Sequence, residues 1–83
     1  MEVNVKLMGS LREKQPGGNS IELLAGASID DLLTILSIAA DQIQVVAINN
    51  HFEYDHGRKL CAGDEVIVLP SVIGHAGAVT AGA

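Results

Sequence analysis

The sequence has very few aromatic residues: Phe52, Tyr54 and no tryptophan among 83 residues. Hydrophobic residues nevertheless make up 48% of the chain, so any core must consist of aliphatic side chains, mainly valine, isoleucine, leucine and alanine. A chain of this length can bury one small core and has no room for a second. Composition and length together predict a single small globular domain.

Cysteine and positive charge are also scarce. Cys61 is the only cysteine, which excludes an internal disulfide and a secreted disulfide-stabilised scaffold. Five lysines and arginines stand against ten acidic residues, for a formal net charge of −5. This balance argues against nucleic-acid binding, because neutralising phosphates requires a basic surface. A basic partner protein fits the charge better.

No segment is typical of an export signal or a membrane span. The chain has no basic start followed by an apolar run and a small-residue cleavage site. Its longest apolar runs are much shorter than the roughly 20 residues that a transmembrane helix needs. We therefore expect a cytoplasmic protein that does not enter a membrane.

Alternating apolar and polar residues predict the first strand over residues 2–8, with Val3, Val5 and Leu7 on one face. A loop rich in glycine follows, and a second, shorter strand is predicted over residues 20–24.

Helical spacing follows the second strand. Apolar residues recur three and four positions apart: Ile29, Leu32, Leu33 and Leu36. Ser28 is the predicted N-cap, and Asp30 and Asp31 place negative charge where the helix dipole favours it. Asp41 is predicted to cap a further short turn.

Three more strands are predicted after the helix. The apolar run over residues 45–49 is typical of a buried central strand, and Asn49 and Asn50 favour a tight hairpin turn into a short strand over 51–54. The last strand is predicted over 65–69. This order of elements predicts an α+β fold, with a sheet of four to five strands packed on one main helix.

Four segments carry a family likeness. They are residues 5–13 (VKLMGSLRE), 26–33 (GASIDDLL), 45–49 (VVAIN) and 63–66 (GDEV), the last leading to Leu69 and Pro70. As an ordered set they resemble the molybdopterin synthase small subunit and thiamine sulfur-carrier family. The first segment is closer to the molybdopterin branch, and the resemblance spans residues 2–74.

The resemblance implies a ubiquitin-like β-grasp domain over residues 1–74, with a mixed sheet whose first and last strands are parallel, followed by a flexible extension over 75–83. Such a protein is not an enzyme but a co-substrate that carries sulfur on its C-terminal carboxylate. An E1-like enzyme uses ATP to adenylate that carboxylate, and a sulfur donor displaces AMP. The resulting thiocarboxylate donates sulfur to an acceptor such as the molybdopterin synthase large subunit. The chain itself is expected to bind no cofactor.

The C-terminus departs from this family. The family's terminal Gly-Gly pair falls on Gly74 and His75, and residues 76–83 follow. A protease could trim the chain after Gly74 or Gly77 and expose a glycine carboxylate, which suits a narrow active site because glycine has no Cβ. The untrimmed terminus could instead be activated directly. Alternatively, the chain is a carrier-derived binding or regulatory subunit without thiocarboxylate chemistry.

In the same family, the sheet face near the last strand and the tail dock against both enzymes. The predicted contact residues are Leu69, Pro70, Ser71, Val72, Ile73 and His75. The histidines show no metal-ligand spacing, so we expect them at the surface and no metal site. Cys61 is predicted to be buried and to act as a small hydrophobic residue.

Overall fold

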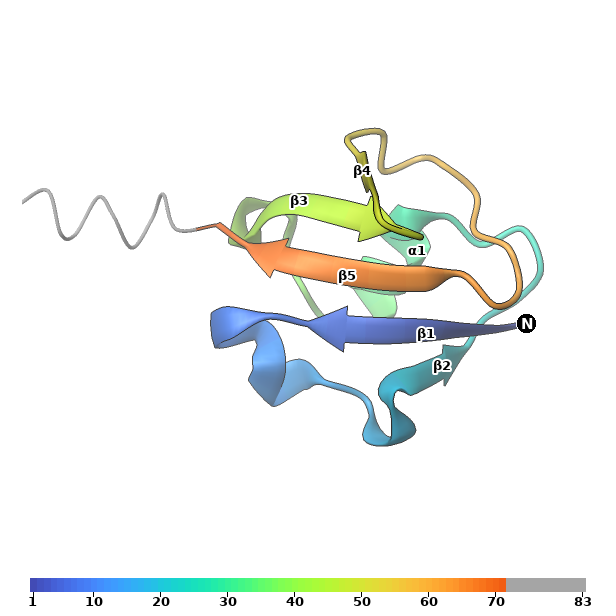
Figure 1. The fold of residues 1–83 in the computed structure, drawn as a ribbon, viewed down its shortest axis with the longest axis horizontal. Helices are drawn as coiled ribbons and strands as arrows, with labels where there is room; N and C mark the ends of the chain where they lie inside the picture. Colours follow the sequence, from blue (N-terminus) through green and yellow to red (C-terminus); the bar gives the residue numbers. More distant parts are fainter. Residues whose placement is uncertain (72–83) are drawn as a thin grey trace, which may run out of the picture.

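The computed structural model describes residues 1–71. Within these residues, five strands form one sheet with an α-helix behind it (Figure 1). The regular elements are β1 (Glu2–Leu7), β2 (Ser20–Glu22), α1 (Ile29–Ile35), β3 (Ile43–Ile48), β4 (His51–Glu53) and β5 (Glu65–Pro70). Short 3₁₀ segments are η1 (Gly9–Lys14), η2 (Gly17–Asn19) and η3 (Ala40–Gln42). The predicted domain boundary after residue 74 lies outside the described residues.

The strands lie in the order β2-β1-β5-β3-β4. Strands β1 and β5 are parallel, and the other neighbours are antiparallel. This confirms the predicted α+β, β-grasp architecture and the parallel pairing of the first and last strands. The last strand thus occupies the middle of the sheet, so the chain leaves the domain from its centre.

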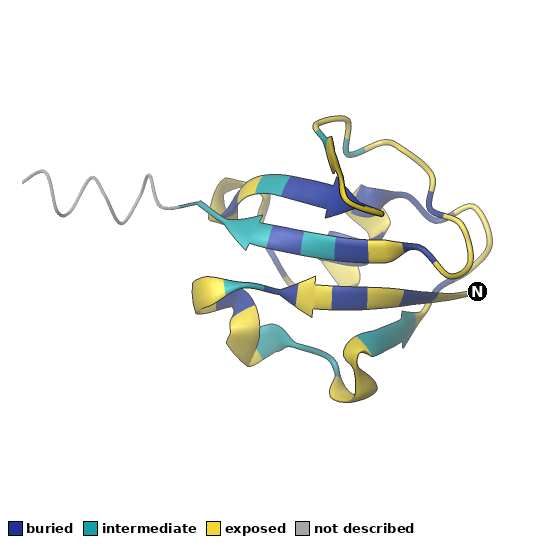
Figure 2. Ribbon diagram, in the orientation of Figure 1, coloured by how far each residue is buried: buried dark blue, intermediate teal, exposed yellow. Residues whose placement is uncertain are grey.

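The core lies between the sheet and α1 and is entirely aliphatic. Burial alternates along β1 and β5, as Figure 2 shows, and Val3, Val5, Val66 and Val68 are all at most 2% exposed. The two aromatic side chains take no part, since Phe52 is 64% exposed. The predicted aliphatic core is confirmed.

The start of α1 is set by a reciprocal pair of hydrogen bonds. The Ser28 side chain accepts from the Asp31 N–H at 3.2 Å, and the Asp31 carboxylate accepts from the Ser28 N–H at 2.8 Å. The predicted N-cap is therefore confirmed, with Asp31 completing a capping box. The prediction for Asp41 is wrong. The side chain of Gln42 instead accepts from the Ala39 N–H at the start of η3, at 2.9 Å.

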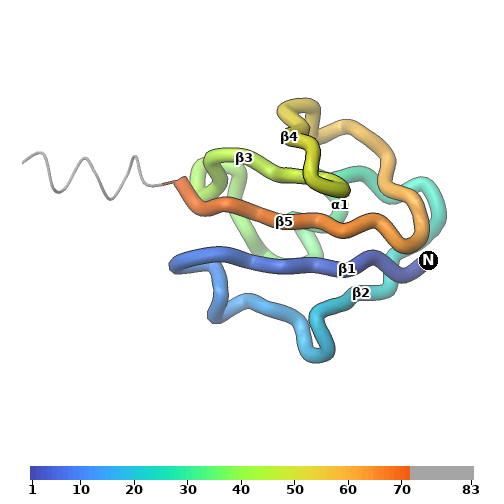
Figure 3. The backbone as a smooth tube through the Cα atoms, viewed as in Figure 1, coloured from blue at the N-terminus to red at the C-terminus, as the bar shows by residue number. Residues whose placement is uncertain are grey.

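Figure 3 shows that residues 8–19 leave the end of β1 and return beneath it before β2 begins. Strand β2 is shorter than predicted and pairs only with the first half of β1, at Glu2 to Asn4. At the other hairpin, Asn49 and Asn50 have φ angles of 50° and 72°, which confirms the tight turn between β3 and β4.

Candidate functional site

The chain leaves the sheet at a closely packed point. A Cβ added to Gly9, whose φ is +54°, would lie 2.9 Å from Cγ of Pro70. Glycine therefore allows the end of β5 to approach the end of β1. Beyond Pro70, the Ser71 N–H donates to the Gln42 carbonyl at 2.8 Å, which ties the exit to η3. Pro70 and Ser71 are thus held by η1 on one side and η3 on the other.

The face of the sheet turned away from α1 is partly apolar near this exit. In the register, Leu69 lies opposite Val45, Ile67 lies opposite Ala47, and Ala47 lies opposite Phe52. Because their neighbours in β3 and β5 point into the core, these side chains point outward. Met8 continues the alternation of β1 in extended conformation, also outward. We call Met8, Val45, Ile67, Leu69 and Phe52 the outer-face patch.

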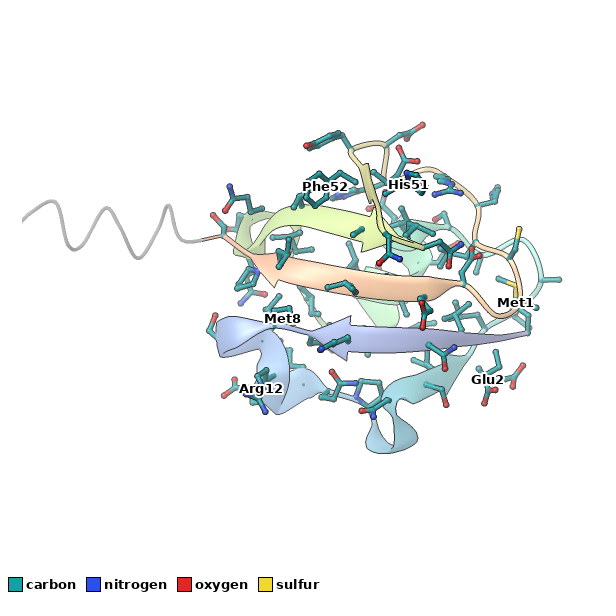
Figure 4. All side chains as sticks on the ribbon, viewed as in Figure 1. Met1, Glu2, Met8, Arg12, His51 and Phe52 are labelled. Atoms are coloured by element: carbon teal, nitrogen blue, oxygen red, sulfur yellow. The ribbon has the colours of Figure 1, made fainter. Side chains whose placement is uncertain are left out.

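Figure 4 shows Met8 at the end of the sheet where β5 leaves, with Phe52 over β3. Met8, Val45, Ile67 and Leu69 are half-buried, whereas Phe52 is exposed. An exposed large aromatic side chain beside partly exposed aliphatic ones is the usual composition of the centre of a protein–protein interface. The patch therefore has the character of a docking surface next to the chain exit.

Of the predicted contact residues, the structure places Leu69, Pro70 and Ser71 together at the exit, all half-buried. Leu69 belongs to the outer-face patch. The remaining predicted site residues, Val72, Ile73, Gly74, His75 and Gly77, lie outside the described residues. Sequence reasoning missed the other four residues of the patch, Met8, Val45, Ile67 and Phe52. The alternation along β1 carried a signal for Met8, but which strands lie side by side did not follow from alternation alone.

The Asp31 carboxyl is the clearest electrostatic feature near α1. Its pKa is held below the usual value, first by the hydrogen bond from the Ser28 backbone, then by the Ser28 side chain, and to a smaller degree by the charge of Lys59. A desolvation effect opposes this shift. Because this carboxylate caps α1, which lies behind the sheet, its role is structural.

The prediction that Cys61 is buried is wrong, because its side chain is exposed. Its backbone N–H donates to the Asp64 carboxylate at 2.8 Å in the turn before β5, and the preceding Leu60 fills the core position instead. His51 is exposed, and His56 Nδ1 lies 3.7 Å from a carboxylate oxygen of Asp30. Residues 1–71 contain no group of three or more histidine, cysteine or acidic side chains placed to hold a metal ion.

No helix within residues 1–71 is both long and apolar enough to cross a membrane. 

A mixed five-stranded sheet over one helix, with the chain leaving from the central strand, defines a ubiquitin-like β-grasp domain. The model of the ThiS family matches residues 5–74, and the chain belongs to this family. This confirms the resemblance drawn from the sequence. Proteins of this family are small sulfur-carrier subunits of larger complexes and are not themselves enzymes.

Several solved structures are similar to the chain, and three of them illustrate the likeness. SAMP1 from Haloferax volcanii is 22% identical with a TM-score of 0.67, and the match covers 87% of this chain and 97% of that one. A putative molybdopterin converting factor subunit 1 from Pyrococcus furiosus is 25% identical, also with a TM-score of 0.67, covering 87% and 99% of the two chains.

The third is a complex of subunits 1 and 2 of the molybdopterin-converting factor from Helicobacter pylori, at 22% identity and a TM-score of 0.57, covering 87% and 96%. At 22% identity, the Haloferax and Helicobacter structures show a shared fold. No curated protein matches the chain. The family and the Pyrococcus relative together support a sulfur-carrier role.

Proposed function

We propose that this chain carries sulfur as a thiocarboxylate at its C-terminus, in the biosynthesis of molybdopterin or a related cofactor. The observation that supports this most directly is the extent of the family match, which runs through the whole domain and ends at Gly74. Gly74 is also where the resemblance puts the first glycine of the terminal pair. A carboxylate there would be the group that reacts, and the β-grasp domain would present it.

In the proposed sequence, an E1-like partner binds ATP, and the carboxylate attacks the α-phosphorus and releases pyrophosphate. A sulfur donor then displaces AMP from the acyl adenylate. This chain supplies only the carboxylate and the surface that positions it, and ATP is bound by the partner. A terminal glycine suits the reaction because it has no Cβ to crowd a narrow site and tolerates any φ there.

The reach of the carboxylate depends on where the chain ends. Each extended residue adds at most about 3.5 Å. A terminus at Gly74, three residues past Ser71, therefore reaches about 10 Å beyond the described end of the domain. A terminus at Gly77 reaches about 20 Å. The shorter chain suits a partner that holds the outer-face patch and has its reaction centre nearby.

We infer that trimming by a protease after Gly74, or after Gly77, precedes activation. The imidazole of His75 would put bulk at the position where the family has its last glycine. Gly77 lies between Ala76 and Ala78, and these small side chains would give a protease easy access there. The activated chain would then meet its acceptor.

The outer-face patch is the proposed docking surface for both the E1-like enzyme and an acceptor such as a molybdopterin synthase large subunit. The Helicobacter structure, a complex of subunits 1 and 2, supports an acceptor of this kind. Since both enzymes must reach the same carboxylate, we expect them to bind in turn at the same face of the sheet.

Intact-mass measurement tests the proposal. The chain ending at Gly74, the chain ending at His75 and the full 83-residue chain are each incubated with the E1-like enzyme of the same organism, ATP and ammonium sulfide. We expect the mass of an oxygen-to-sulfur exchange on the chain ending at Gly74 and none on the chain ending at His75. The matched control is the Gly74-terminated chain carrying Gly74→Val, which should remain a carboxylate.

A second sample, the chain purified from its native host, shows whether trimming occurs. Truncation after Gly74 or Gly77, or the sulfur mass, would support the carrier. If none of the three incubated chains gains the sulfur mass, and the chain from the native host is found only as the full-length carboxylate, sulfur transfer is excluded. Binding of that unmodified chain to the large subunit would then support the alternative, a carrier-derived β-grasp binding or regulatory subunit.

A further inference from the structure

An open groove of about 990 Å³ lies beside the outer-face patch, along β1. The side chains that matter for its chemistry are Lys6, Arg12, Gln15, Asn19, Glu65 and Ile67. Its floor is the outward face of β1 and β5, where Lys6 lies opposite Ile67. The remaining lining residues come from Met8, η1, Gln15 and η2. Met8 and Ile67 also line the groove, which makes it continuous with the patch.

The groove holds two of the three cationic side chains that make no hydrogen bond or ion pair within residues 1–71. The side chains of Lys6 and Arg12 are exposed and make no hydrogen bond or ion pair with any of residues 1–71.

The other three cationic side chains lie outside the groove. Lys14 Nζ donates to the Ser37 carbonyl, and Arg58 lies 3.5 Å from the Glu53 carboxylate. Lys59 also makes no hydrogen bond or ion pair within residues 1–71, but it pairs with Ser28 through a backbone bridge at the start of α1, behind the sheet.

Charge is also distributed unevenly along the groove. Glu2 and Glu65 stand at the starts of the parallel strands β1 and β5, whereas Lys6 and Arg12 lie toward their ends. Figure 4 shows Arg12 at the end of the sheet where β5 leaves and Glu2 at the opposite end. Lys6 is four positions along the strand from Glu2, a distance of about 13 Å, which exceeds the screening length of about 8 Å at physiological salt. Glu65 is nearer and offsets part of the Lys6 charge, but Arg12 lies beyond it, nearer the exit.

We propose that this groove binds an acidic segment of the protein that docks on the outer-face patch, with carboxylates of the partner meeting Arg12 and Lys6 beside the chain exit. The inference rests on the docking surface of the proposed function. A partner that covers the patch also covers the groove, because the two share Met8 and Ile67. Burying two unpaired cations would oppose binding unless the partner supplies anions.

The groove is open, and its two cations come from separate elements, which suits an extended peptide segment better than an enclosed small anion. The partner segment in the groove would then be acidic, whereas the net charge of −5 favoured a basic partner. Local charge near the exit, and not the total charge, would orient the partner.

A titration of the ¹⁵N-labelled full-length chain with hexaglutamate, capped at both ends, tests the inference by NMR. We expect amide shifts that cluster at Lys6, Met8, Arg12 and Ile67 and that vanish at high salt. A capped hexalysine peptide should leave these four amides unmoved. Shifts spread equally over Lys14, Arg58 and Lys59, or no shifts at all, would overturn the proposal.

Matched double variants sharpen the test, because they lose the same charge. Lys6→Gln with Arg12→Gln should weaken hexaglutamate binding by about fivefold or more. Arg58→Gln with Lys59→Gln should change it less than about twofold. Equal weakening in the two would mean that only net charge matters and would overturn the proposal.

The titration uses neither ATP nor sulfur, so a failure to form thiocarboxylate would leave its result standing. Failed peptide binding, in turn, would not affect the sulfur-carrier proposal.

Discussion

The side-chain amide of Gln15 completes the edge of β1 at Leu7. Its Oε1 accepts from the Leu7 N–H at 2.7 Å, while its Nε2 donates to the Val5 carbonyl at 2.7 Å. Strand β2 pairs only as far as Asn4, so these later backbone groups of β1 have no strand beside them. One side chain takes the place of a strand, and the same residue helps to line the groove that contains Arg12.

We expect Gln15→Leu to lower the free energy of unfolding by about 1–3 kcal/mol, because it leaves two partly buried backbone groups without partners. Chemical denaturation followed by circular dichroism measures this change. Gln44→Leu is the matched control, since Gln44 is exposed on β3 and its side chain makes no hydrogen bond within residues 1–71. The control should shift stability by less than about 0.5 kcal/mol. Equal losses in both variants would contradict this role for Gln15.

The capping box predicts how stability depends on pH. The pKa of Asp31 is lowered in the folded chain, chiefly by the Ser28 N–H, from a usual value of 3.8. The charged carboxylate therefore stabilises the fold above that usual value, and the stabilisation is lost as the pH falls through the lower folded-state pKa. Asp31→Asn, which keeps an acceptor oxygen but not the charge, should be less stable at neutral pH and lose less stability on acidification.

Thermal unfolding of the wild type and Asp31→Asn across acidic pH measures this difference. Asp41→Asn serves as the control, because the Asp41 side chain has no hydrogen-bond or ion-pair partner within residues 1–71. It should keep the wild-type pH dependence. Parallel stability curves for wild type and Asp31→Asn would show that the carboxylate charge contributes nothing.

The two asparagines of the β3–β4 turn should respond in opposite directions to the same substitution. Asn49 Nδ2 donates to the buried Asp64 carboxylate at 3.0 Å, and its Oδ1 accepts from the Glu65 N–H at 2.9 Å. Asn49→Gly should therefore cost about 1–3 kcal/mol of unfolding free energy. Asn50 has a φ of 72° and makes no such bonds, so Asn50→Gly should be neutral or stabilise by roughly 0.5 kcal/mol. Denaturant titration of both variants measures their free energies of unfolding. Losses of equal size would contradict the hydrogen-bonding role given to Asn49 alone.

Local patterns in the sequence predicted much of this fold. Alternation in β1, helical spacing after Ser28 and the Asn49–Asn50 turn all depend on neighbours in the chain, and each is confirmed. The prediction for Cys61 failed because apolar character alone did not show which residue of the turn before β5 reaches the core: Asp64 holds the turn, and Leu60 fills the core position. The edge role of Gln15 was not predicted, because it depends on how far β2 extends along β1.

Only part of the candidate site could be predicted from the sequence. Leu69 was expected near the exit because of the family resemblance, and the structure places it beside Pro70. Met8 and Phe52 join it only through the pairing of β1, β5, β3 and β4, which brings residues far apart in sequence onto one face. Strand parity says which side a residue faces but not which strands are neighbours.

Phe52 offers a test of the outer-face patch itself. Its side chain is 64% exposed, so Phe52→Ala should change the free energy of unfolding by less than about 0.5 kcal/mol. If the patch is the docking surface, the same variant should bind the large subunit of the same organism about tenfold or more weakly, because exposed aromatic residues at the centre of an interface contribute most to affinity.

Ile35→Ala is the control for that experiment, because Ile35 is a similarly exposed (55%) hydrophobic residue on α1, behind the sheet. Isothermal titration calorimetry with the purified large subunit should give wild-type affinity for Ile35→Ala and a clear loss for Phe52→Ala. Equal affinities for the two variants would remove the sheet face from the docking surface. A larger loss for Ile35→Ala would move the interface to the helix side, where no partner could cover the groove of Lys6 and Arg12 as well.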